Sequence, residues 1–94
     1  MTRALKETTA YINSCIRNMD HHVDHLKEKA ELDVKTKREW ALSRIEEDYR
    51  QAFGALQLAY IYLEEIEEED GDALADMLLK AKNKAWDRVF EEIE

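Results

Sequence analysis

Three histidines and two aspartates gather in one short run, whose side chains are of the types that bind metal ions. The run reads Asp20-His21-His22-Val23-Asp24-His25. On a helix, His21 and His25 would lie four residues apart on one face, within reach of a single ion. A structural or catalytic zinc site needs three or four protein ligands, and the paired Glu-x-x-His motifs of di-iron bundles are absent from the sequence. We therefore interpret the run as a solvated helix face and predict no metal site.

The other reactive residue types form no recognisable catalytic set. Cys15 is the single cysteine, which excludes an intramolecular disulfide and a cysteine-built zinc site and suggests a reducing compartment. The histidines follow Cys15 farther along the same predicted helix, so we expect no base beside the thiol. Two isolated glycines, Gly54 and Gly71, cannot form a phosphate-binding loop. We predict no catalytic residue, no bound cofactor and no enzymatic activity.

Length and composition predict one small helical domain. The chain has 94 residues, 45% of them hydrophobic, with no proline and two glycines. This content argues against disorder and against an all-β fold, which needs many tight turns. The longest apolar stretch, residues 52–63, is too short for a transmembrane helix, which needs about 20 residues, and the start of the chain does not resemble a signal peptide. We expect one domain over residues 1–94, located in the cytoplasm without membrane contact.

The elements that carry these residues are predicted from apolar side chains that recur at alternating steps of three and four, the spacing of a coiled-coil seam. Such stripes predict helices at about 3–31, 37–69 and 73–92. The first stripe is Leu5, Thr9, Ile12, Ile16, Met19, Val23, Leu26 and Ala30; the second is Leu42, Ile45, Tyr49, Ala52, Leu56, Ala59, Leu63 and Ile66; the third is Leu74, Leu78, Ala81, Ala85, Val89 and Ile93, widened by Met77, Trp86 and Phe90.

The predicted turns set the predicted topology. Asp70-Gly71-Asp72 offers a glycine to end one helix and an aspartate to cap the next, and Thr36 with Glu39 fits a capping box after a turn near residues 31–36. The predicted third helix would then cover only half of the second. We therefore predict an all-α, antiparallel three-helix bundle in which residues 20–45 project as a charged, coiled-coil-like two-helix arm. The alternative is one long N-terminal helix plus a shorter C-terminal helix, in an oligomer.

Negative charge is concentrated in the second half of the chain. The protein carries 14 basic and 22 acidic side chains, a net charge of −8, and no Lys or Arg interrupts the acids between residues 64 and 76. If the predicted second helix ran to residue 69, these carboxylates would oppose its dipole at roughly 0.3–1 kcal/mol each. Local helix stability would not select that arrangement, so we interpret the run as a surface for a basic partner. The predicted partner-binding residues are Glu64, Glu65, Glu67, Glu68, Glu69, Asp70 and Asp72, with Tyr60 and Tyr62 as exposed aromatic anchors.

These features predict a non-enzymatic acidic protein that inhibits or adapts a partner protein by docking on a basic surface. If that surface normally holds nucleic acid, the protein would compete for it, as small acidic phage-encoded regulators do. This analogy is based on size and charge and not on any shared residue pattern. Direct nucleic-acid binding is disfavoured by the net negative charge. The alternative function is structural self-assembly through the long seam, which leaves a homo-oligomer open. A metal-dependent helical enzyme is the third and weakest reading.

Overall fold

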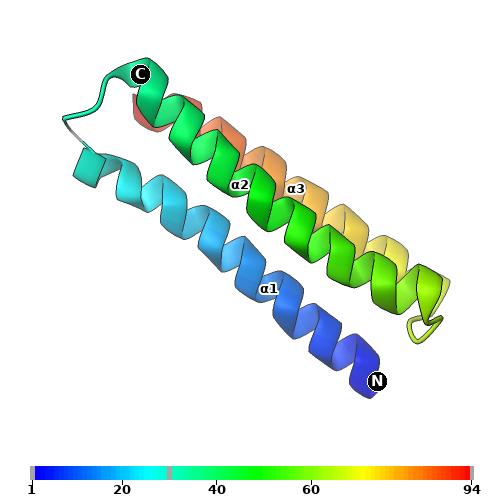
Figure 1. The fold of residues 1–94 in the computed structure, drawn as a ribbon. Coiled ribbons are helices and arrows are strands. Elements are labelled where there is room, and N and C mark those ends of the chain that lie inside the picture. The colour runs from blue at the N-terminus through cyan, green and yellow to red at the C-terminus, as the bar shows by residue number, and fades with distance from the viewer. Residues whose placement is uncertain (1, 30, 94) are drawn as a thin grey trace.

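The chain folds as an all-α, antiparallel three-helix bundle, as the apolar spacing predicted. A computed structural model describes residues 2–29 and 31–93. The helices are α1 (Arg3–Asp24), a 3₁₀ turn η1 (His25–Lys29), α2 (Val34–Gln57), a π-helical turn η2 (Leu58–Tyr62) and α3 (Glu68–Ile93). Figure 1 shows the start of α1 and the α2–α3 connection at the same end of the bundle. The predicted long N-terminal helix is wrong, because α1 and α2 are separate and pack against each other.

Side-chain caps place the starts of the first two helices. The hydroxyl of Thr2 accepts from the N–H of Leu5 at 3.1 Å, and the carboxylate of Asp33 accepts from the N–H of Thr36 at 2.7 Å. Hydrogen bonds from Thr36 to the carboxylate hold the pKa of Asp33 below its usual value. The predicted capping box at Thr36 is therefore wrong: α2 starts at Val34, and Asp33 is its N-cap, which satisfies one of the otherwise unpaired N–H groups of the first turn.

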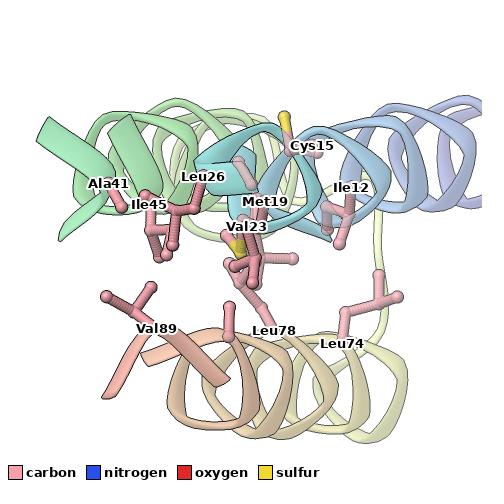
Figure 2. Packing of buried hydrophobic residues seen from close by; sticks show 14 of the residues in the cluster. Ile12, Cys15, Met19, Val23, Leu26, Ala41, Ile45, Leu74, Leu78 and Val89 are labelled. Carbon is pink, nitrogen blue, oxygen red and sulfur yellow. The ribbon is translucent and has the colours of Figure 1, made fainter. Parts of the chain in front are cut away.

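The core runs along the whole length of the bundle. Fully buried side chains come from all three helices, including Ile12 and Met19 of α1, Ile45 of α2 and Leu78 of α3. Figure 2 shows these apolar side chains filling the space between α3 and the α1–α2 pair, whereas the sulfur of Cys15 points away from α3. Ala30 and the side chain of Ile93, both assigned to apolar stripes, lie outside the described residues.

The predicted projecting arm is wrong. Val23, Leu26, Ala41 and Ile45, all within residues 20–45, are between 0 and 3% exposed. The three helices have 22, 24 and 26 residues, so their lengths match at about 33, 36 and 39 Å. α3 therefore reaches the far end of the bundle, where Val89 is fully buried and Arg88 binds Asp20 and Asp24 of α1 at 3.3 and 2.8 Å.

The predicted boundary between the second and third helices is also wrong. The chain turns at residues 63–67, and Asp70, Gly71 and Asp72 all lie within α3. This earlier turn places Glu68, Glu69 and Asp70 in the first turn of α3. A carboxylate gains about 0.3–1 kcal/mol at a helix N-terminus and loses a similar amount at a C-terminus. For three carboxylates the two placements differ by roughly 2–6 kcal/mol before screening by salt, in favour of the observed turn.

Ion pairs and cation–π contacts join neighbouring helices outside the core. Lys82 of α3, for example, pairs with Glu46 of α2 at 3.1 Å and lies over the rings of Tyr49 and Trp86. Within residues 2–29 and 31–93, no helix is both long and apolar enough to cross a lipid bilayer.

Candidate protein-binding surface

The C-terminal end of α2 is irregular. η2 is closed by the N–H of Leu63, which donates to the carbonyl of Leu58 at 2.9 Å. Glu64 follows with a φ of 52°, in the left-handed region, and the N–H of Glu65 donates to the carbonyl of Ala59 at 2.9 Å. A left-handed backbone costs a residue other than glycine roughly 1–2 kcal/mol. π-helical turns are rare in proteins, and many of those that occur lie at functional sites. Strained segments of this kind gather at binding sites, so this end of the bundle is a candidate binding surface.

Four large apolar side chains are exposed within six consecutive residues here, and we call them the apolar patch: Leu58, Ile61, Tyr62 and Leu63. Tyr62 is 76% exposed, and the other three are each more than half exposed. The prediction that Leu63 belongs to the core is therefore wrong. The stretch is apolar on every side, but α1 and α3 can cover only part of it, so the surplus faces solvent. Exposed apolar groups with a charged rim are typical of protein-binding surfaces.

Tyr60, unlike the exposed Tyr62, packs within the bundle. Its ring lies against α3, so close to Gly71 that a Cβ added there would be 2.6 Å from the ring. Tyr60 is half-buried, and its pKa is raised by burial and then by the carboxylates of Asp72 and Glu68. Tyr60 therefore joins η2 to the start of α3, and only part of its surface is open to a partner.

The acidic residues of the α2–α3 region surround this end of the bundle. Residues 51–79 contain eight acids and no Lys or Arg. The seven predicted binding acids, which we call the acidic end, lie in the connector (Glu64, Glu65 and Glu67) or at the start of α3 (Glu68, Glu69, Asp70 and Asp72). All are exposed except Asp70, which is half-buried.

The acidic end has a structural role. Glu65, Glu67 and Asp70 line a pocket together with Thr2 and Leu5, so these acids lie beside the N-terminus of α1 as well as that of α3. Carboxylates are favourable at both positions. The predicted energetic penalty for the acid run is therefore wrong for the acids that follow the turn, and their placement alone is not a sign of function.

A groove beside the apolar patch was not predicted from the sequence. It has a volume of about 250 Å³ and lies between α1 and the end of α2. Its lining includes the large apolar side chains of Tyr11, Leu58 and Leu63 and the acidic residues Glu7 and Glu65. Tyr11 is 44% exposed. A signal was present in the sequence, since the stretch at 52–63 has more apolar side chains than two neighbouring helices can cover.

A second group of ionisable side chains lies between α1 and α2. Asp48 is 92% buried, and Nε2 of His22 lies 3.0 Å from its Oδ2, although not in line for a hydrogen bond. Burial raises the pKa of Asp48, while the adjacent His22 opposes that rise. Burial and the charge of Asp48 also raise the pKa of the Cys15 thiol. A raised pKa disfavours the thiolate, which is the nucleophilic form, so this arrangement does not activate Cys15.

The histidine run divides between solvent and core. His21 is exposed and its ring meets that of His25 edge to face at 4.0 Å, while Nε2 of His25 lies 3.4 Å from a carboxylate oxygen of Glu28. His22 instead packs edge-on against Trp40. In the part of the chain that the structure describes, no three His, Cys, Asp or Glu side chains are grouped so that they could hold a metal ion.

Comparisons with known proteins add no relative. No protein-family model matches the chain, and neither a curated protein nor a solved structure is significantly similar to it.

Proposed function

We propose that this protein is a non-enzymatic binding protein of the cytoplasm that inhibits or adapts a partner protein by docking its acidic end and apolar patch on a basic surface. The observation that carries the proposal is the exposure of Leu58, Ile61, Tyr62 and Leu63 directly beside the acids of the connector. Carboxylates are favourable at the nearby helix N-termini, whereas the Leu, Ile and Tyr side chains of the apolar patch are each more than half exposed and would gain from burial against a partner.

The two components contribute differently to binding. Burying a large apolar side chain completely is worth about 1.5–3 kcal/mol, so each half-exposed member of the apolar patch could supply roughly 1 kcal/mol. The acidic end would steer a basic partner and raise the association rate, an effect that salt weakens. Affinity is therefore assigned mainly to the apolar patch, and partner choice to the acidic end.

A partner surface that is rich in Lys and Arg and also accepts apolar side chains fits this description. Many such surfaces bind nucleic acid. Where the partner uses the same surface for nucleic acid, docking of the acidic end would exclude it, which gives the inhibitory form of the proposal. Where the surface is otherwise free, the protein would act as an adaptor.

Self-assembly is the second candidate, and it would need a different face from the one first expected. The seam residues Ile12, Met19 and Val23 are fully buried within one chain, so they are not available to a second copy. Leu79 and Phe90 of α3 remain exposed and could serve that purpose. A sedimentation-equilibrium measurement tests this: a salt-insensitive oligomer would favour the structural role.

The main experiment compares two charge variants of equal net charge. Glu64→Gln/Glu65→Gln neutralises two of the three connector acids, and Glu39→Gln/Glu47→Gln neutralises two exposed acids on α2. A partner captured from the native cell is purified, and its Kd for each variant is measured at low and high salt. We expect the connector variant to bind more than tenfold more weakly at low salt, which is over about 1.4 kcal/mol, with a smaller difference at high salt. The control should bind like the parent.

A second pair of variants tests the apolar patch. Tyr62→Ser should raise the dissociation rate with little salt dependence, whereas Leu79→Ser, on the surface of α3, should not. Displacement of nucleic acid from the partner is then measured by competition. Equal effects of both charge variants, or no effect of Tyr62→Ser, would contradict docking through this end of the bundle.

A further inference from the structure

We propose that the groove between α1 and the end of α2 receives a short amphipathic helix of the partner, with its apolar side chains in the groove and its basic side chains on Glu7 and Glu65. This inference rests on the proposed function and specifies how the partner binds. The bundle would thereby gain a local fourth helix.

The floor of the groove is built for close approach. Thr8 of α1, Ala55 of α2 and Ala59 of η2 all line the groove. Small side chains at these positions leave space that bulkier residues would fill. Antiparallel helices present such rows as a channel, into which the ridge of a further helix packs. This shape favours a helix over a peptide that binds by strand addition, because strand addition needs an open sheet edge and the described residues form no strand.

The size of the groove limits the occupant. On α1 it extends from Ala4 to Tyr11, which corresponds to about 10 Å or two helical turns. Its volume of about 250 Å³ is below the usual range of about 300–1,000 Å³ for small-molecule sites. The groove therefore suits two or three anchor side chains spaced three or four residues apart better than it suits a cofactor.

The negative charge beside the groove favours an occupant with positive charge. Glu7 lies on one side and Glu65 on the other, and Glu64 is adjacent. None of the residues that line the groove is a Lys or Arg, and Glu7 forms an exposed ion pair with Arg3 at 2.8 Å. A helix with Lys or Arg on both flanks of its apolar stripe could pair with both edges, whereas an acidic helix would be repelled.

A pair of synthetic peptides tests this proposal without knowledge of the partner. The probe is a fluorescein-labelled peptide of Leu and Lys, with Leu at helical anchor spacing and Lys elsewhere. The control peptide has the same composition in an order that spreads Leu around the helix. Fluorescence anisotropy with the full chain should give at least tenfold tighter binding of the probe than of the control peptide. Amide chemical-shift changes on addition of the probe should centre on Thr8, Tyr11 and Leu58.

Filling the groove should remove that preference. Ala55→Leu places a larger side chain in it and should reduce probe binding at least tenfold, while Ala10→Leu, on the exposed face of α1, should not. Leu58→Ser, which removes one wall at an exposed position, provides a second variant should Ala55→Leu fail to fold. Circular dichroism establishes that each variant is folded.

The outcomes separate this inference from the proposed function. If both peptides bind equally and Ala55→Leu has no effect, while Glu64→Gln/Glu65→Gln still weakens the captured partner, the groove proposal falls and charge-led docking stands. If the probe binds in the groove but the captured partner binds Glu64→Gln/Glu65→Gln as tightly as the parent protein, the proposed function is refuted. If neither peptide binds, the groove proposal is refuted.

Discussion

Replacing Gly71 by alanine should destabilise the protein, against the usual effect of that substitution in a helix. Gly71 lies inside α3 with an ordinary negative φ, so the backbone itself would accept alanine. By helix propensity alone, Gly→Ala would raise the free energy of unfolding by about 0.5–1 kcal/mol. The added Cβ, however, would lie 2.6, 2.8 and 2.9 Å from Cδ2, Cε2 and Cγ of Tyr60.

The size of this clash determines how much free energy of unfolding Gly71→Ala should cost. Carbon atoms in ordinary contact are about 3.5–4.0 Å apart, so the Tyr60 ring would have to retreat by roughly 1 Å. Overpacking of this kind costs about 1–3 kcal/mol. Subtracting the propensity gain leaves an expected loss of up to about 2 kcal/mol. Displacement of Tyr60 would also disturb η2 and with it the apolar patch.

Gly54 provides the matched control, because a Cβ added there meets no other atom within 4 Å. Gly54→Ala should stabilise the protein by about 0.5–1 kcal/mol, so the two substitutions should differ by about 1–3 kcal/mol. Urea unfolding followed by circular dichroism measures this directly, and each kcal/mol corresponds to about 4–8 °C in Tm. In a Tyr60→Ala background, Gly71→Ala should become stabilising. If Gly71→Ala stabilises the parent as much as Gly54→Ala does, the proposed contact with Tyr60 is refuted.

Three further predictions concern strain, the extent of the core and pH. Glu64→Gly should raise the free energy of unfolding by about 0.5–1 kcal/mol in urea, because glycine adopts the left-handed backbone without strain; no gain would count against the positive φ. Ile45→Ala should lose about 2–5 kcal/mol, as Leu56→Ala should, since both are buried; a much smaller loss at Ile45 would restore the projecting arm. The folded-state pKa of Asp48 is raised, so the stability that its proton contributes is present below the unfolded pKa of about 4 and lost as the pH rises through the folded pKa. Asp48→Asn should therefore be at least as stable as the parent at pH 7 and lose its relative advantage near pH 3, and a pH-independent difference in urea unfolding would contradict this.

The alternating spacing of apolar residues predicted the class of fold because burial follows helical periodicity directly. Ile12, Met19 and Val23 lie in the core for the reason that the sequence suggests: each falls on one face of a helix. The same spacing could not place the ends of the helices. Residues 64–69 are compatible with helix on propensity, and the choice of where to turn depends on which helix terminus the carboxylates adjoin.

The candidate site, like the fold, could be predicted only in part from the sequence. The concentration of acid at residues 64–72 is visible in the sequence, and Tyr62 is exposed as expected. The groove was not visible, because it exists only where α1 packs on α2 and leaves Tyr11 and Leu58 uncovered.

Local chemistry along the chain thus determined that this protein is helical, where its apolar faces lie and which segment carries its charge. Tertiary structure decided how far each helix extends and what each irregular residue does. Gly71 is the clearest example: beside two aspartates it has the local signature of a turn, yet it lies inside α3, where the ring of Tyr60 occupies the space that a side chain would need. A contact between residues 60 and 71 depends on how α2 and α3 pack, and no local pattern encodes that packing.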